Sequence, residues 1–165
     1  MIKIIHNLFC GDKYDVLKAL EQNFAVASMC KESNYGHRDL VGYSTLGCPQ
    51  DSPNYYFIEK GKEFAANLID VEDPTFIKSE VITPALKFIK KHYDKGEKVL
   101  IRCEGGESRG PTTTLMFLRS INEFPYSYKN AYKIMKTIYP KLDPGKGMEI
   151  YAKTHWNDLL KVYEE

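Results

Sequence analysis

The chain contains no apolar run of about 20 residues, the length that a membrane-spanning helix needs. Its first residues, MIKIIHNLFCGD, lack the basic start, the long apolar segment and the small-residue cleavage site of a signal peptide. The formal net charge is only +1, so no overall field favours an anionic membrane or a nucleic acid as partner. We therefore expect a cytoplasmic protein that binds no membrane and, on composition, is not built for nucleic acid.

Cysteine is scarce, and the four cysteines at positions 10, 30, 48 and 103 lie too far apart for a CxxC redox or zinc motif. No disulfide framework is expected in a reducing compartment. Cys10 and Cys30 fall in apolar, strand-like runs and are predicted to be small core residues. The histidines on predicted elements show no ligand spacing, so no metal site is predicted. Cys103 differs from the other cysteines because of the residues that follow it.

No internal repeat, linker or low-complexity tract divides the chain, and its length suits one domain spanning residues 1–165. Strand-like runs alternate with helical patterns, and a series of helices follows. This order predicts an α/β fold with a central, mostly parallel sheet flanked by helices. The clearest helix lies in KSEVITPALKFIKKHYDKG; it begins at Thr83 or, with Pro84 tolerated near the first turn, at Ser79.

Several other elements can be predicted in outline. IKIIHNLFCG is typical of one strand closed by a glycine turn, and residues 33–54 are typical of a long loop with one short element. Ser127 is a favourable N-cap for a helix over SYKNAYKIMKTIY. A last helix is predicted from about Met148 to Val162.

The segment KVLIRCEGGESRGPTTTLMFL places a glycine-rich, charged loop between a buried strand and a helix. Three glycines, at positions 105, 106 and 110, allow this loop to curl so that its amides point inward. The free N–H groups and the positive dipole end of the following helix face the same hollow. The sequence therefore predicts a nest for a tetrahedral oxyanion. The predicted phosphate-binding residues are Glu104, Gly105, Gly106, Glu107, Ser108 and Arg109.

Cys103 and Arg109 begin and end this loop and suggest its chemistry. The planar guanidinium of Arg109 can donate to two phosphate oxygens at once. A thiol beside inward amides, a helix N-terminus and a guanidinium is expected to be held as a thiolate nucleophile. We therefore predict that Cys103 attacks phosphorus while Arg109 holds the oxygens.

The segment VLIRCEGGESRG resembles the signature of the cysteine-based protein tyrosine phosphatases, which is Cys, five residues, Arg. In the dual-specificity branch a glycine occupies the third position after the cysteine, and Gly106 matches it. The resemblance covers the chain well from about Asn67 onward and the first third only loosely. It implies the dual-specificity phosphatase fold and hydrolysis of phosphate monoesters on phosphotyrosine, with phosphoserine and phosphothreonine as further substrates. It also implies a cysteinyl-phosphate intermediate and no metal or organic cofactor.

Cleavage of a phosphate monoester also needs a proton donor for the leaving oxygen. The IDVEDP segment offers Asp70 and Asp73. Asp73 lies 30 positions before Cys103 and aligns with the acid of the family in VEDP, so Asp73 is the predicted general acid. Asp70 is the alternative acid, and its ordinary role would be that of a turn or cap residue.

Two residues depart from the pattern of the family. Arg102 stands where members usually have histidine, and a strand side chain there would face away from the phosphate. Gly110 stands where members have Ser or Thr, whose hydroxyl supports the sulfur as leaving group. Its loss is expected to slow hydrolysis of the intermediate unless Ser108 or Thr113 substitutes.

Three alternative functions remain open at this point. CEGGESRGP also resembles the loop of cell-cycle phosphatases built on a rhodanese fold. A second alternative is a catalytically weak or inactive phosphate-binding module, and a third is an RNA 5′-phosphatase of the same superfamily. Glu104 and Glu107 form an acidic rim that disfavours polyanionic substrates such as phosphoinositides. The preferred prediction is a monomeric phosphatase that acts on phosphoproteins or phosphopeptides.

Overall fold

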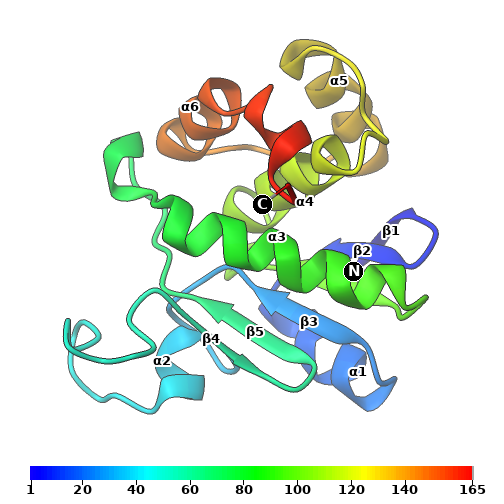
Figure 1. The fold of residues 1–165 in the computed structure, drawn as a ribbon. Coiled ribbons are helices and arrows are strands. Elements are labelled where there is room, and N and C mark those ends of the chain that lie inside the picture. The colour runs from blue at the N-terminus through cyan, green and yellow to red at the C-terminus, as the bar shows by residue number, and fades with distance from the viewer. Residues whose placement is uncertain (165) are drawn as a thin grey trace.

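The computed structural model of the protein describes residues 1–164 and shows a six-stranded sheet with helices on both faces (Figure 1). The strand order is β1-β2-β6-β3-β5-β4, in which the four central strands run parallel and each edge strand is antiparallel to its neighbour. The predicted α/β fold with a mostly parallel sheet is confirmed. The strands are β1 (Ile2–Ile5), β2 (Leu8–Gly11), β3 (Ala25–Ser28), β4 (Phe57–Lys60), β5 (Glu63–Ala66) and β6 (Val99–Arg102). The helices are α1 (Val16–Glu21), α2 (His37–Val41), α3 (Ser79–Asp94), α4 (Arg109–Ser120), α5 (Tyr128–Ile138) and α6 (Lys146–Thr154).

Alternate residues of the central strands pack into two separate cores. On β6, Val99 and Ile101 join the large core under α3, α4, α5 and α6, whereas Leu100 joins a smaller core under α1. Figure 1 shows α3 lying across one face of the sheet, with α1 and α2 on the opposite face. Because side chains alternate along a strand, a strand covered on both faces is apolar throughout. The run KVLIRC has this pattern, so β6 is the central buried strand, and its carboxyl end is where Cys103 follows.

Two segments that were each predicted as one continuous element are interrupted in the structure. IKIIHNLFCG is not one strand but a hairpin of β1 and β2, because Asn7 adopts a φ of 63°, which reverses the chain and which asparagine tolerates. The last helix ends at Thr154 and is followed by a 3₁₀ turn at Asp158–Lys161. Trp156 lies between them: its Nε1 donates to Tyr126 O, and its carbonyl accepts from Arg119 Nε. These bonds to other segments replace the helical ones.

The other boundaries agree with the sequence. α3 begins at Ser79, the earlier of the two predicted starts, and contains Pro84. Ser127 caps α5 through its Oγ, which accepts from Asn130 N at 3.3 Å. The long loop predicted at residues 33–54 contains one short helix, α2. Cys10 and Cys30 are fully buried, as predicted for core residues.

Arg102, the last residue of β6, is buried completely, with 0% of its surface exposed. Its guanidinium donates to three neutral oxygens, one on the last residue of β3 and two in the chain that follows β3. The acceptors are Ser28 Oγ at 2.7 Å, Ser33 Oγ at 2.8 Å and Asn34 O at 2.7 Å. One planar fork thus fixes the 28–34 segment to the carboxyl end of β6.

Replacing Arg102 should therefore destabilise the fold through these three acceptors. Arg102→Met keeps much of the side-chain volume but leaves buried oxygens without a donor, so we expect a loss of about 3 kcal/mol in the free energy of unfolding. Arg102→Lys keeps the charge but cannot reach all three oxygens and should lose less. Urea denaturation measures both. A loss below about 1 kcal/mol for Arg102→Met would show that the fork does not fix this segment.

Candidate active site

The 103–108 segment joins β6 to α4 and bonds to the rest of the protein through its carbonyl groups. The carbonyls of residues 104, 106 and 107 each accept a hydrogen bond, one from the chain after β2 and two from the chain after α5. The donors are Lys13 N at 3.3 Å, Tyr139 Oη at 2.7 Å and Asp143 N at 2.8 Å, respectively. In a trans peptide the next N–H points opposite to the carbonyl. The N–H groups of residues 105, 107 and 108 therefore face away from these donors, toward the inside of the curl.

Gly106 is required for this curl on two grounds. Its φ is +72°, a conformation that L side chains rarely adopt. A Cβ at this position would also lie 3.0 Å from the Asp12 Cβ and 3.0 Å from Tyr139 Oη. The glycine that the sequence pattern singled out thus shapes the loop from behind.

The inside of the curl is a hollow of about 320 Å³ at the N-terminus of α4. Cys103 lies in it with only 2% of its surface exposed. The residues that line the hollow are Asp70, Cys103, Gly105, Glu107, Ser108, Arg109, Asp143, Pro144 and Gly145. Four of the six predicted phosphate-binding residues are among them. The other two, Glu104 and Gly106, support the loop instead: Glu104 pairs with Lys13 at 2.9 Å on the rim.

Arg109 is held in place by two acceptors. Its Nη1 donates to Leu68 O at 2.9 Å, and its Nη2 forms an ion pair with Glu32. Burial opposes the charge of Arg109, but the hydrogen bond and charge of Glu32 outweigh burial and raise the pKa of the guanidinium. The same ion pair lowers the pKa of Glu32. Sequence reasoning missed Glu32; its only signal was a charged residue placed just after a buried strand.

The other two thiols near the sheet are of a different kind. Burial raises the pKa of Cys10 to about 12 and that of Cys30 to about 11. Both thiols therefore stay protonated and unreactive at neutral pH. Of these three cysteines, only Cys103 lines the hollow and faces the helix N-terminus.

The two candidate acids occupy different positions. Asp70 lines the hollow, and its Oδ1 accepts from Ser108 Oγ at 3.1 Å. Asp73 caps a 3₁₀ turn at Pro74–Phe76, where its Oδ1 accepts from Thr75 N at 2.9 Å and Thr75 Oγ1 at 2.8 Å. These bonds lower the pKa of the fully exposed Asp73 carboxyl, which opposes a role as proton donor. The geometry thus favours Asp70, the alternative in the sequence prediction.

Gly145 makes room for Asp70, and sequence reasoning did not assign it a role. A Cβ at position 145 would lie 2.5 Å from Asp70 Oδ1. Its N–H donates to Ser108 Oγ at 2.7 Å, and that hydroxyl donates to Asp70. This hydrogen-bonded chain joins the acid, the 103–108 segment and the chain before α6. Ser108 and Gly145 are therefore positioning residues for Asp70.

Gly110 also fills a position where a side chain does not fit. A Cβ there would lie 2.9 Å from Arg102 C and 3.0 Å from Cys103 N, which are backbone atoms. Of the two hydroxyls considered as substitutes, that of the buried Thr113 donates to Arg109 O at 2.7 Å. Only the hydroxyl of Ser108 lines the hollow.

Residues 1–164 form neither a candidate metal cluster nor a candidate membrane-spanning helix. In this part of the chain, no three His, Cys, Asp or Glu side chains are grouped so as to hold a metal ion. Nor does any helix within it combine the length and hydropathy required to cross a bilayer.

Comparison with known proteins identifies the fold. No protein-family model and no curated protein matches the chain. Among solved structures, a leucine-rich repeat and phosphatase domain containing protein from Entamoeba histolytica is 18% identical, with 99% of this chain and 95% of that chain covered and a TM-score of 0.60. Human DUSP28 is 15% identical, with 99% and 92% covered and a TM-score of 0.60. A human tyrosine phosphatase-like serine/threonine/tyrosine-interacting protein is 15% identical, with 97% of each chain covered and a TM-score of 0.63.

At these identities the likeness concerns the fold, which is that of the dual-specificity and protein tyrosine phosphatases. The fold implied by the sequence resemblance is therefore confirmed over the whole chain, including the first third. The alternative of a rhodanese fold is wrong.

The hollow should bind a tetrahedral oxyanion in a way that depends on the shape of Arg109. Arg109→Lys keeps the positive charge but loses the planar fork, so we expect tungstate to bind about tenfold more weakly. Isothermal titration calorimetry measures this. Arg38→Lys, an arginine outside the hollow, is the matched control and should bind tungstate as the native chain does. Equal affinities for the native chain and Arg109→Lys would contradict the assignment of the hollow.

Proposed function

We propose that the protein is a phosphatase that hydrolyses phosphate monoesters on phosphotyrosine, and also on phosphoserine and phosphothreonine, of protein substrates. The observation that carries this proposal is the position of the Cys103 thiol. It lies in a hollow bounded by inward N–H groups, the N-terminus of the 12-residue helix α4 and the Arg109 guanidinium. This arrangement supports both a thiolate and the three equatorial oxygens of a transferring phosphoryl group.

The proposed reaction has two steps. In the first, the Cys103 sulfur forms a bond to phosphorus while the bond from phosphorus to the ester oxygen breaks, and a general acid protonates the departing oxygen. In the second, water attacks the cysteinyl-phosphate, the acid residue now accepts a proton from that water, and the sulfur leaves as thiolate. Inorganic phosphate and the free enzyme result. Arg109 and the inward N–H groups stabilise the oxygens in both steps.

Asp70 is the general acid of this proposal. Its place in the hollow and the hydrogen-bonded chain through Ser108 support the role, because the donor must lie within reach of the ester oxygen. Asp73, predicted from spacing, has its oxygen engaged by Thr75 and a lowered pKa. These hydrogen bonds favour the ionised form of Asp73 over the protonated form that a proton donor needs.

The charges around the hollow favour a protein substrate over a polyanion. Glu107 and Asp143 line it beside Asp70, so Arg109 is the only cation among its lining residues in the part of the chain that the structure describes. A phosphoinositide or an RNA 5′ end would bring additional negative charge to this rim and be repelled. A single phosphorylated side chain on a peptide avoids most of that repulsion.

Cys103→Ser should abolish turnover of p-nitrophenyl phosphate, because a hydroxyl at this position lacks the nucleophilicity of a thiolate. The steady-state release of p-nitrophenol measures this. A rapid-mix experiment on the native chain should show a burst of p-nitrophenol, because Gly110 supplies no hydroxyl to assist sulfur departure and the Ser108 hydroxyl is donated to Asp70. A native chain that binds tungstate but releases no p-nitrophenol would identify a binding module instead of an enzyme.

Asp70→Asn should lower kcat on a phosphotyrosyl peptide by about 10² or more, since its leaving group needs a proton. The matched control Asp73→Asn should stay within about threefold of native activity. A loss of about 10² in Asp73→Asn, with Asp70→Asn close to native activity, would return the role to Asp73.

A further inference from the structure

A groove of about 340 Å³ lies beside the loop that carries Asp70. It runs between the chain that precedes β4 and the chain that leads into α3. Most of its wall is apolar, and its charged members are both lysines. The residues that matter for the argument are Tyr55, Tyr56, Ile69, Phe76, Lys31 and Lys78.

The apolar side chains of this groove are unusually exposed. Phe76 is 69% exposed, Ile69 is 50% exposed and Tyr56 is 39% exposed. Leu46, 87% exposed, precedes Gly47 on the rim. Single exposed apolar residues are common, but several in one hollow indicate an interaction surface.

The groove and the hollow of the active site share one segment of chain. Leu68 O accepts from Arg109 Nη1 at 2.9 Å on the side of the hollow and from Lys31 N at 3.2 Å on the side of the groove. The next two residues also contribute to the two cavities separately: Ile69 lines the groove, and Asp70 lines the hollow. A peptide with its phosphorylated side chain at Cys103 would therefore pass directly by the groove.

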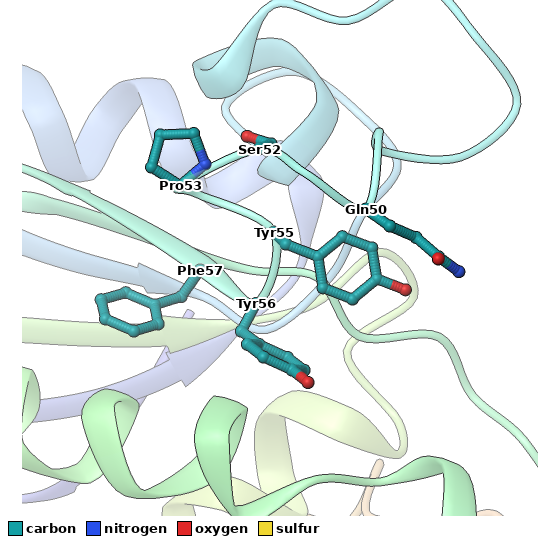
Figure 2. Close-up of a pocket in the computed structure, with 6 residues that line it drawn as sticks. All are labelled: Gln50, Ser52, Pro53, Tyr55, Tyr56 and Phe57. Atoms are coloured by element: carbon teal, nitrogen blue, oxygen red, sulfur yellow. The ribbon is translucent and has the colours of Figure 1, made fainter.

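A second hollow, of about 580 Å³, extends the groove beyond the Tyr55 and Tyr56 rings, which line both (Figure 2). The two rings contact edge to face, with centroids 5.1 Å apart. Figure 2 shows them projecting from one stretch of chain, with Gln50 and Pro53 on the same loop and Phe57 at the start of β4. This aromatic surface lies next to the groove and increases the surface that a bound peptide could contact.

The aromatic wall is fixed before any ligand binds. Asn67 Nδ2 donates to Tyr55 O at 2.8 Å, and Asn67 N donates to Tyr56 O at 2.9 Å. The buried His37 bonds to Asn54 O at 2.7 Å and to Tyr43 Oη at 2.9 Å. These bonds hold the chain before β4 in one conformation, so a ligand would not have to order it on binding.

The charge of the groove is opposite to that of the hollow. Lys31 and Lys78 line it, and its described lining includes no carboxylate. Lys31 Nζ donates to Leu46 O at 2.7 Å, so its charge is directed at the groove rim without a carboxylate partner in the described part of the chain. An acidic residue on a ligand would be attracted here and repelled at the acidic rim of the hollow.

We propose that this groove is a specificity site for the phosphoprotein substrate. It takes a large apolar side chain, aromatic or aliphatic, that lies next to an acidic residue on one side of the phosphorylated residue. This inference rests on the proposed function. It goes further by stating which sequences around the phosphorylated residue are preferred.

The test uses two phosphotyrosyl peptide series, one scanning Phe or Leu beside Glu through the flanking positions and one with Ser in place of the Phe or Leu and the Glu kept. The native chain should show kcat/KM about tenfold higher for the best apolar peptide than for its Ser counterpart. The double variant Phe76→Ala with Tyr56→Ala should lose that preference and keep turnover of p-nitrophenyl phosphate within about twofold. Leu17→Ala, 56% exposed on α1, is the matched control and should keep the preference.

Turnover of p-nitrophenyl phosphate separates the two proposals. If the native chain hydrolyses it but shows no apolar preference, or if the double variant keeps that preference, the groove proposal is overturned and the proposed function stands. If nothing is hydrolysed, binding of the same peptides to the native chain by fluorescence anisotropy decides: tenfold tighter binding of the apolar peptide, lost in the double variant, supports the groove. Equal binding of both series overturns it.

Discussion

The rest of the site depends on the hydrogen bonds that hold the carbonyl groups between Cys103 and Arg109 outward, toward neighbouring segments. Three groups on two neighbouring segments each donate one hydrogen bond to this short stretch, from Lys13, Tyr139 and Asp143. Because each peptide unit is planar and trans, tying the oxygen outward turns the next N–H inward. A row of such donors at the N-terminus of α4 concentrates positive potential on one sulfur atom. Without these tethers the same residues would form an ordinary surface loop.

Close approach of backbones gives the site its shape, and glycines make it feasible. Gly145 leaves space for the Asp70 carboxylate, and Gly147 brings its N–H to Val71 O at 3.1 Å where a Cβ would lie 2.1 Å from that oxygen. The chain before α6 can thus lie directly on the chain that carries Asp70. Gly110 does the same for α4 and β6. Asp70, Cys103 and the inward N–H groups are thus fixed in one packed unit, as preorganised electrostatics would require.

Two arginines, Arg109 and Arg102, are held by different kinds of contact. Arg109 is paired with a carboxylate, Glu32, whereas Arg102 is buried among neutral oxygens of the segment that carries Glu32. Arg102 therefore acts on the hollow indirectly. It fixes the segment that carries Glu32, and Glu32 orients the guanidinium of Arg109. The same segment includes Lys31, which borders the groove. Recognition of the phosphate and of its flanking residues would thus depend on a common support.

Features that depend on residues close together in the chain could be predicted from the sequence. They are the α/β order, the α3 helix with Ser79 as one of two possible starts, the Ser127 cap and the strand-loop-helix unit around Cys103. The hairpin at Asn7 was missed, because only the two polar residues His6 and Asn7 interrupt the apolar run and neither Gly nor Pro marks the turn.

Residues that lie far from Cys103 in the chain are brought to its hollow by the packing of separate segments, which local sequence does not reveal. Spacing along the chain favoured Asp73, but the direction of a side chain depends on the backbone turn and on what packs against it, and the fold brings Asp70 into the hollow. Glu32 and Gly145 joined the site for the same reason: they lie far from Cys103 in the chain, and only packing of separate segments brings them to it.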